Sequence, residues 1–440
     1  MRIAGRDIDT IARADVVVAG SGPGGLGAAL SAARSGASVV LCERYGFLGG
    51  NVTAAAVGSV CGYYGNRGTW ETPSFEPVVG GVASEILDSL AASGNGMGPI
   101  PFKEQTAVFL YKPWAAKRLF DHMISEAGRI DLLLHTVVVD TICTDGEMQA
   151  LVVGTKNGLA AVEGRVFIDA TGDADVSKFS GVETVAGSPD GAQQFASMQF
   201  FMANVDDASV LEANAALSGL IERFGDHLSR DGGAVLPTFN PGQVTGAMTR
   251  VRRADGAPLD ATDVRQATYG ELEGRRLAEE AAEFLCAHVP GFESAYLSDT
   301  AVQLGVRETR HVVGDYVLTG DDVRSGARFD DAVASCSWPQ EYHTTGRSTR
   351  YEFLDAGLTY QVPYRCLVPN GPRNLLVVGR AISADHDALA SVRVMAPCLA
   401  LGQAAGTAAA MVVRDDLGQV RDVDTDELRS ELLAAGARTD

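Results

Sequence analysis

The feature that most constrains this chain is a glycine-rich turn set between a short apolar strand and an alanine-rich helix. The strand reads Val-Val-Val-Ala over 16–19 and the turn reads Gly-Ser-Gly-Pro-Gly-Gly over 20–25. A helix predicted over 26–35 then precedes a second apolar strand over 38–42, and Gly36 stands where a glycine commonly ends a helix. This order predicts a βαβ unit and therefore a parallel sheet.

The glycines of this turn have distinct predicted tasks. The first allows a tight turn, the second lets the backbone approach a pyrophosphate, and the third permits close packing of helix on strand. Glu43 follows the second strand, 23 positions after Gly20, where a carboxylate accepts hydrogen bonds from ribose hydroxyls and disfavours a 2′-phosphate. Together they predict a dinucleotide site, for NAD or FAD, with the anion at the helix N-terminus.

Three later segments favour FAD. Residues 49–53, Gly-Gly-Asn-Val-Thr, supply flexible backbone and small polar side chains where a long dinucleotide continues. Residues 169–173 end another predicted parallel strand, at the edge where ligands of such sheets bind. Residues 391–397 lead into a helix with Gly402, and amides at a helix start stabilise the negative charge of a reduced flavin. The first two segments, each taken alone, are also compatible with an ordinary structural turn.

The remaining pattern predicts an interleaved α/β fold. Helices are expected over 113–128 and 397–413, an antiparallel meander over 132–141, 149–155 and 159–163, and further strands of the main sheet over 166–169 and 375–378. We therefore predict a Rossmann-like FAD-binding domain, with a parallel sheet and a β-meander, plus an inserted α+β substrate domain. The FAD-binding domain takes residues 1–70, 113–184 and 361–440 with the C-terminal tail, and the substrate domain takes 71–112 and 185–360.

Charge and cysteine usage exclude several function classes. The chain has 36 Lys and Arg against 56 Asp and Glu, a net charge of -20, and no basic stripe, so nucleic acids and anionic membranes are not expected partners. Its seven cysteines are scattered without a Cys-x-x-Cys pair, which argues against a metal or iron-sulfur site. The cysteine usage, together with the lack of a signal-peptide or membrane-span pattern, predicts a cytoplasmic protein.

Taken in order, these motifs resemble the FAD-dependent oxidoreductases of the glutathione-reductase-like superfamily. The branch related to the flavin subunit of heterodisulfide reductase is the most similar. The resemblance rests on residues 15–53, 168–176, 305–310, 360–367 and 379–406. It implies noncovalent FAD, with the adenosine over the glycine turn and the flavin near 49–53 and 391–403. The cysteine motifs of iron-sulfur clusters are missing, so electron bifurcation through clusters in this chain is not expected.

The predicted FAD-contacting residues come from seven separate segments of the chain. They are Gly20, Ser21, Gly22, Pro23, Gly24, Gly25, Glu43, Arg44, Gly49, Gly50, Asn51, Thr53, Val138, Ala170, Thr171, Gly172, Asp173, Gly379, Arg380, Val392, Arg393, Pro397, Gly402 and Gln403. The resemblance assigns Val138 to the adenine, through the backbone of the meander.

Three residues are candidates for the chemistry. His386 precedes the predicted flavin-capping segment and could accept a substrate proton near neutral pH, or be a loop histidine bonded to Asp385 or Asp387. Arg393 could orient a substrate carboxylate, pair with flavin, or tie a loop to the core. Arg307 belongs to a charged cluster over 307–311 that suits carboxylate recognition, although a structural network at the domain interface also explains it.

A flavin dehydrogenase or oxidase acting on a small polar, possibly anionic, organic molecule is the leading hypothesis. A reductase or monooxygenase fed by NAD(P)H is the second, although no further glycine fingerprint marks a nicotinamide domain. The third is an electron-transfer flavoprotein subunit of a larger complex. A homo-oligomer and a redox partner protein are both compatible with the chain.

Overall fold

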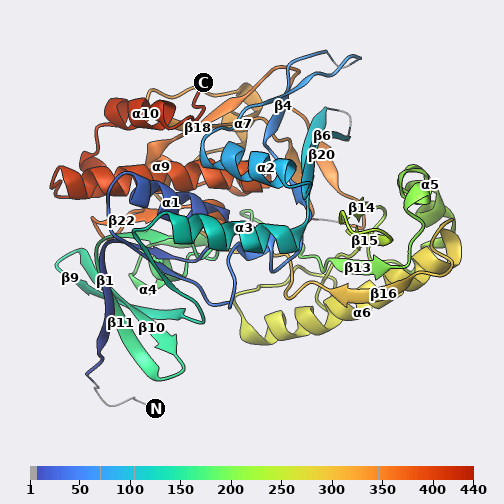
Figure 1. Cartoon of the computed structure of the whole chain (residues 1–440), viewed down its shortest axis with the longest axis horizontal. Coiled ribbons are helices and arrows are strands. Elements are labelled where there is room, and N and C mark those ends of the chain that lie inside the picture. Colours follow the sequence, from blue (N-terminus) through green and yellow to red (C-terminus); the bar gives the residue numbers. More distant parts are fainter. Residues whose placement is uncertain (1–6, 70, 104, 345) are drawn as a thin grey trace.

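The computed structural model describes residues 7–69, 71–103, 105–344 and 346–440. Residues 1–6, which belong to the stretch expected to lack a signal peptide, lie outside these ranges, as does residue 70 at a predicted domain boundary. The fold is of the α/β class, as predicted, and is built on one mixed sheet (Figure 1).

Parallel strands form the half of this sheet that lies next to the glycine turn. β1 (Thr10–Ala19) lies between β2 (Val39–Cys42) and β11 (Gly158–Asp169), and all three run parallel. β8 (Ile130–Leu133) extends the sheet beside β2, and β22 (Leu375–Val377) pairs with the end of β11. The stretches 16–19 of β1, 39–42 of β2 and 375–377 of β22 are continuous buried apolar runs because both faces of the sheet are covered there, which is typical of parallel sheets.

The antiparallel half is the predicted meander, with two corrections. The strand expected over 132–141 is two strands, because its start joins the parallel sheet as β8 while β9 (Val137–Thr144) turns back against β10 (Glu147–Thr155). The strands expected over 159–163 and 166–169 are one, β11, which pairs with β10 through its first half and β22 through its second. Asp145 and Gly146 join β9 to β10 with φ values of 52° and 76°, as a tight hairpin turn requires.

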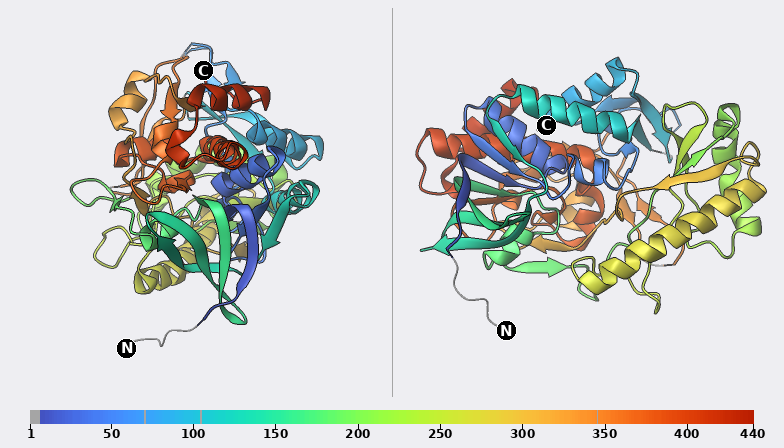
Figure 2. Two further views of the ribbon diagram at one scale, coloured as in Figure 1. Left: turned by 90° about the vertical axis from the view of Figure 1, so that its left-hand side faces the viewer. Right: turned by 60° about the horizontal axis from the view of Figure 1, so that its bottom comes forward.

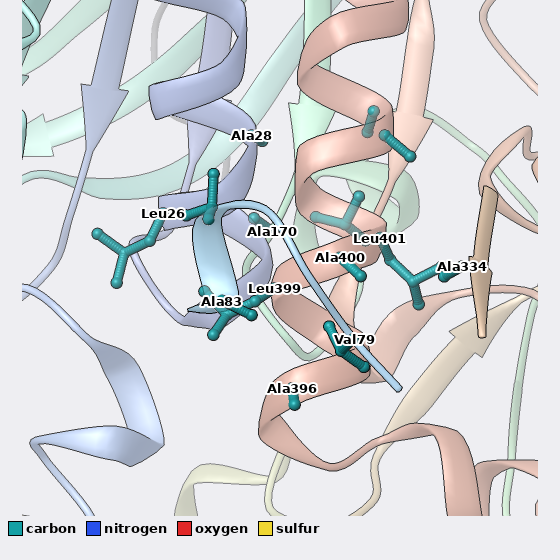
Figure 3. Packing of buried hydrophobic residues seen from close by; sticks show 14 of the residues in the cluster. Leu26, Ala28, Val79, Ala83, Ala170, Ala334, Ala396, Leu399, Ala400 and Leu401 are labelled. Carbon is teal, nitrogen blue, oxygen red and sulfur yellow. The ribbon is translucent and has the colours of Figure 1, made fainter. Parts of the chain in front are cut away.

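Two helices with small residues pack face to face above the parallel strands (Figure 3). α1 (Pro23–Arg34) and α9 (Met395–Arg414) approach so closely that a Cβ added to Gly402 would lie 2.0 Å from the carbonyl oxygen of Gly24. A Cβ on Gly406 would lie 2.2 Å from the carbonyl oxygen of Ala28. α9 is long and apolar enough to cross a membrane by composition, but 94% of that stretch is buried inside the protein. It is therefore a core helix in this fold.

A second hydrophobic core lies at the far end of the molecule from the meander (Figures 1 and 2). It joins an antiparallel sheet of β13 (Phe200–Ala203), β14 (Val235–Pro237), β15 (Gln243–Gly246) and β16 (Tyr296–Thr300) to α5 (Val210–Phe224) and α6 (Val264–His288). Side chains such as Phe200, Phe284 and Leu285 fill it. This is the α+β part of the chain.

The segment predicted as one substrate domain over 185–360 contributes to more than this core. Residues after β16 return to the main core, where Val333 and Trp338 are buried with residues of α9. The other described elements are α2 (Val82–Ala92), α3 (Pro113–Glu126), α4 (Asp175–Phe179), α7 (Gly320–Ser325), α8 (His386–Val392), α10 (Thr425–Ala434), β3 (Ser59–Val60), β4 (Tyr64–Asn66), β5 (Phe75–Pro77), β6 (Gly96–Phe102), β7 (Thr106–Tyr111), β12 (Thr184–Ala186), β17 (Arg310–Val312), β18 (Ala332–Cys336), β19 (Gln340–Tyr342), β20 (Arg350–Glu352) and β21 (Tyr360–Pro363). The domain boundaries themselves stay a prediction.

Candidate functional site

A cavity of about 460 Å³ lies along the carboxyl-terminal edge of the parallel strands. The turns that follow four of these strands line it, with residues 20–24 after β1, 43–45 after β2, 170–172 after β11 and 379–380 after β22. Ligands of parallel α/β sheets bind at this edge, and the volume falls within the range usual for ligand pockets.

Some glycines of the turn have free space where a side chain would stand, and others do not. Gly22 is the N-cap of α1 without a side-chain cap, so the first-turn amides of the helix face the cavity end unpaired by a side chain. A Cβ added to Gly22 would meet none of the described atoms within 4 Å beyond its chain neighbours. In contrast, a Cβ on Gly20 would lie 2.5 Å from the oxygen of Ala170, and one on Gly25 would lie 1.8 Å from the oxygen of Gly20. Gly25 therefore serves packing, and the cavity lining ends at Gly24.

Glu43 is buried beside this turn. Its Oε2 accepts hydrogen bonds from the amide and hydroxyl of Ser21, at 2.9 and 2.5 Å, and its Oε1 accepts one from the amide of Tyr45 at 2.9 Å. A carboxylate oxygen can accept two hydrogen bonds, so Oε1 keeps one acceptor position. Val138 lines the cavity nearby, because the amide of Thr136 donates to the carbonyl of Glu43 and starts the chain into β9. Arg44 lines the cavity as well.

The turn over 49–53 contributes two lining residues and two structural ones. Gly50 and Asn51 line the cavity, and a Cβ on Gly50 would lie 2.9 Å from the Cα of Gly22. Gly49 instead holds the turn, since its φ is 114° and its amide donates to the carbonyl of Ser21. The hydroxyl of Thr53 donates to the carbonyl of Leu48 at 2.6 Å and also stays inside the turn.

The loops after β11 and β22 meet across the cavity floor. Ala170, Thr171, Gly172, Gly379 and Arg380 line it, as does Asp175, which the sequence did not single out. The predicted residue Asp173 does not line it, because its carboxylate is engaged by Arg380 at 3.2 Å and by the hydroxyl of Thr309 at 2.7 Å.

Two charged residues of this cavity floor, Arg380 and Asp175, are in unfavourable surroundings. Nη1 of Arg380 is buried and has no hydrogen-bond partner among the described residues. Burial and the neighbouring charges of Asp173 and Asp169 together raise the pKa of Asp175 to about 6, against the opposing effect of Arg310. Arg310 forms an ion pair with Asp175 at 2.5 Å.

The start of α9 differs from the prediction. The lining residues there are Val394, Met395 and Cys398, which the sequence did not single out. The four predicted residues around them have packing roles. Val392 is buried in α8, the ring of Pro397 lies where a Cβ on Gly62 would be, and Gly402 contacts α1. Oε1 of Gln403 accepts a hydrogen bond from the amide of Val82 at 3.0 Å, which satisfies the first turn of α2.

Three arginines line the other end of the cavity. Nη1 of Arg307 donates to the carbonyl of Phe195 at 2.7 Å and to the hydroxyl of Ser197 at 3.0 Å, and Nη2 of Arg393 donates to the carbonyl of Glu341 at 3.1 Å. Arg230 completes the group. Nε of Arg393 is buried without a hydrogen-bond partner among the described residues.

The arginine charges are costly in this position. Burial, together with the like charges of Arg393 and Arg230, lowers the pKa of Arg307 to about 9. Burial also lowers the pKa of Arg393. Neither guanidinium lies within 4 Å of a carboxylate in the described part of the chain. An anion in the cavity would relieve this excess of positive charge.

Glu341 of β19 faces the same end and carries no sequence motif. Its Oε1 accepts hydrogen bonds from Nε2 of His343 at 2.9 Å and from the hydroxyl of Tyr351 at 3.0 Å, and its Oε2 lies 3.3 Å from the indole nitrogen of Trp338. Burial alone would raise the pKa of Glu341, but His343 and the two arginines hold it well below its usual value. Burial, aided by Arg307, lowers the pKa of His343 well below its usual value. Glu341 is thus an ionised carboxylate beside a neutral histidine.

His386 lies outside the described cavity lining. It is the first residue of α8 rather than a loop residue, and its Nδ1 is 2.9 Å from the buried carboxylate of Glu308. The partner is therefore neither Asp385, which caps α8, nor Asp387. Burial opposes protonation of His386, yet Glu308 raises its pKa overall. The predicted role of His386 as a base has no contact with the cavity to support it. Of the charged cluster over 307–311, Arg307 alone lines the cavity.

A search of solved structures finds distant likenesses over nearly the whole chain. A geranylgeranyl bacteriochlorophyll reductase-like protein from Thermoplasma acidophilum is 12% identical, with 97% of this chain and 85% of that chain covered and a TM-score of 0.45. The p-nitrophenol 4-monooxygenase PnpA from Pseudomonas putida DLL-E4 is 12% identical, with 96% and 84% covered and a TM-score of 0.44. BexE, studied for oxidation during BE-7585A biosynthesis, is 16% identical, with 96% and 68% covered and a TM-score of 0.46. No curated protein matches in a sequence search.

The model of one protein family matches nearly the full chain. The match covers residues 15–432 and describes the FAD-dependent oxidoreductases. The uncapped start of α1, the space beside Gly22 and the buried Glu43 are the features that a bound dinucleotide requires. The chain belongs to the family of FAD-dependent oxidoreductases, enzymes whose cofactor is FAD.

Proposed function

We propose that this oxidoreductase is a dehydrogenase or oxidase that takes hydride from a small anionic organic molecule. The observation that carries the proposal is the group of three arginines, Arg230, Arg307 and Arg393, at the end of the cavity away from the glycine turn. Guanidinium groups bind carboxylates through paired hydrogen bonds, and two of these groups, Arg307 and Arg393, are buried and form no ion pair within 4 Å in the described part of the chain. The substrate carboxylate is the missing counter-ion in this proposal.

The residues at the other end would hold the cofactor. The amides after Gly22 would bind the diphosphate, Glu43 the ribose, and the backbone near Val138 the adenine. Bound FAD supplies a hydride acceptor at N5 of its ring system. Arg380, whose Nη1 is buried without a described partner, would donate a hydrogen bond to the cofactor or the substrate.

The arginines would position the substrate and limit what can bind. A carboxylate that pairs with Arg307 and Arg393 would be fixed in direction by their planar donors. Neutral molecules of the same shape would leave the arginine charges uncompensated, so the site would reject them. The overall charge of -20 makes this local positive end distinctive within the protein.

The first experiment follows the absorbance of the purified, FAD-loaded protein without oxygen. A panel of 2-hydroxy acids, amino acids and dicarboxylates is added, and each is matched with its methyl ester. We expect one class of acids to bleach the flavin band while the esters do not. Bleaching by NADH or NADPH alone would instead support a reductase or monooxygenase. Bleaching by neither would leave the electron-transfer subunit and refute the proposal.

Three further features of the protein are proposed on the sequence. They are a relationship to the flavin subunit of heterodisulfide reductase, a cytoplasmic location, and a homo-oligomeric or redox partner. All seven cysteines are free thiols, which is compatible with a reducing compartment. Size-exclusion chromatography of the FAD-loaded protein, alone and in extract, tests the oligomer and the partner.

A further inference from the structure

The positive end of the cavity also contains one strong negative charge. Glu341 lines the cavity beside Arg307 and Arg393, and its side chain is only 14% exposed. It forms no ion pair with an arginine within 4 Å in the described part of the chain, and its ring partner is His343. Because burial and Arg307 keep His343 neutral, the histidine orients this carboxylate without cancelling its charge.

The donors around Glu341 fix its position. In the neutral histidine, Nδ1 lies next to the hydroxyl of Thr349 at 3.2 Å and to Nη2 of Arg250 at 3.4 Å, which are hydrogen-bond donors. The ring proton is therefore on Nε2 and points to Glu341. The hydroxyl of Tyr351 donates to the same oxygen. Oε1 is thereby saturated, whereas Oε2 has only the long contact to Trp338 at 3.3 Å. Oε2 retains an acceptor position.

The other carboxylate at this end of the cavity, Asp231, is different. Asp231 is 41% exposed and lies 2.7 Å from Nε of Arg347, and it also accepts a hydrogen bond from Ser348 at 3.1 Å. Its charge is already matched within the protein and is open to solvent. Glu341 is therefore the carboxylate at this end that has no arginine within ion-pair distance in the described part of the chain, although the charges of Arg307 and Arg393 favour its ionised form. A cationic group of a ligand could still pair with it directly.

We infer that this end of the cavity binds a zwitterion, with the carboxylate on Arg307 and Arg393 and the ammonium group on Oε2 of Glu341. The inference rests on the proposed function and narrows its substrate to amino acids and related amino carboxylates. The arginine pair and the carboxylate of Glu341 then each gain a ligand group of opposite charge. A hydroxy acid or a dicarboxylate provides such a group only for the arginines. A hydroxyl would leave the charge of Glu341 unmatched, and a second carboxylate would be repelled by it.

The test measures binding without turnover. 2-Aminoisobutyrate and 2-hydroxyisobutyrate have the same shape and no hydrogen on the α carbon, so neither can give up a hydride from that position. Calorimetric titration into the FAD-loaded protein compares their affinities, with isobutyrate as the parent acid. We expect 2-aminoisobutyrate to bind about 10-fold or more tightly than 2-hydroxyisobutyrate, because hydrogen bonds to charged groups are the stronger ones.

A variant assigns the preference to one residue. Glu341→Gln keeps the size and the acceptor oxygen of the side chain but removes the charge, so the preference for the amino compound should fall below about 2-fold while isobutyrate binds as tightly or more tightly. Glu352→Gln is the matched control, because Glu352 lies on the adjacent strand β20, pairs with Arg350, and is outside the cavity lining. Equal FAD content and melting temperature establish that both variants are folded.

The outcomes separate the two proposals. Equal binding of the amino and hydroxy compounds to the wild type, or an unchanged preference in Glu341→Gln, would overturn the zwitterion site and leave the anion site standing. Failure of all three acids to bind would refute the anion site itself and the proposed function with it. Loss of the preference only in Glu341→Gln is the result that supports the inference.

Discussion

The two ends of the cavity are built from different parts of the polypeptide. The dinucleotide end is mainly backbone, made by glycine turns that follow parallel strands and by the start of α1. The charged end is side chains, with Arg230, Arg307, Glu341 and Arg393 brought together from separate segments. Backbone recognises the diphosphate common to all dinucleotides, whereas side chains are free to vary with the substrate. The comparison separates what the fold requires from what the reaction requires.

The largest expected effect is a loss of stability at Gly25, where two backbone segments are in contact. In Gly25→Ala the new Cβ would lie 1.8 Å from the carbonyl oxygen of Gly20, which no side-chain rotation can relieve. We expect the free energy of unfolding of the FAD-free protein to fall by about 3 kcal/mol or more, measured by chemical denaturation. Gly22→Ala, which meets open space, should stay within about 1 kcal/mol of the wild type. Similar losses in both variants would contradict the distinction between open and closed glycines.

Removing one arginine should damage the charged end alone. In Arg307→Gln, kcat/KM for the anionic substrate should drop about 10- to 100-fold, the range expected for a lost hydrogen bond to a charge. FAD affinity should change less than about 2-fold, because Arg307 lies at the other end. The matched control is Arg365→Gln, in which the exposed pair with Asp331 is lost. If Arg307→Gln lowered FAD content instead, the separation of the two ends would fail.

Filling the open glycine position should damage the dinucleotide end alone. Gly22→Ala places a methyl group in the cavity beside the first turn of α1, and we expect FAD to bind about 10-fold more weakly. Fluorescence titration of the FAD-free protein measures this. At saturating FAD the variant should keep the substrate KM of the wild type. An unchanged FAD affinity would place the diphosphate elsewhere.

The smallest effect concerns the titratable residue on the cavity floor. The folded-state pKa of Asp175, about 6, exceeds the ordinary value of 3.8, so the folded protein binds the proton more tightly. Its contribution to stability is present at low pH and is lost as the pH rises from about 4 to 6. In Asp175→Asn the melting temperature of the FAD-free protein should decline less across this window than in the wild type. An identical pH profile would show that Asp175 titrates normally.

The difference between the dinucleotide end and the charged end also explains which part of the site could be predicted from the sequence. The dinucleotide end follows from local spacing, since a glycine turn after a strand and an acidic residue after the next strand are recognisable in one linear stretch. The charged end depends on distant pairings. Glu341 could not be predicted from the sequence, because its partners His343, Tyr351 and Arg393 come together only when β19 pairs with β20 and packs against α8.

Two misplacements have identifiable causes. His386 stood near the expected flavin segment, but the buried Glu308, brought close by the fold, takes its Nδ1. Gly402 and Gln403 are predicted cofactor contacts because the resemblance places the flavin near residues 391–403. In the structure Gly402 instead contacts α1, and Gln403 binds the start of α2. A single sequence shows that a backbone must come close without showing what it meets.

The contact between Gly402 and Gly24 also bears on how the enzyme is made. Residues 16–34 are synthesised long before the helix that packs against them, Met395–Arg414. The dinucleotide site therefore stays incomplete until that helix has been made, and a nascent chain halted before residue 395 should be unable to retain FAD.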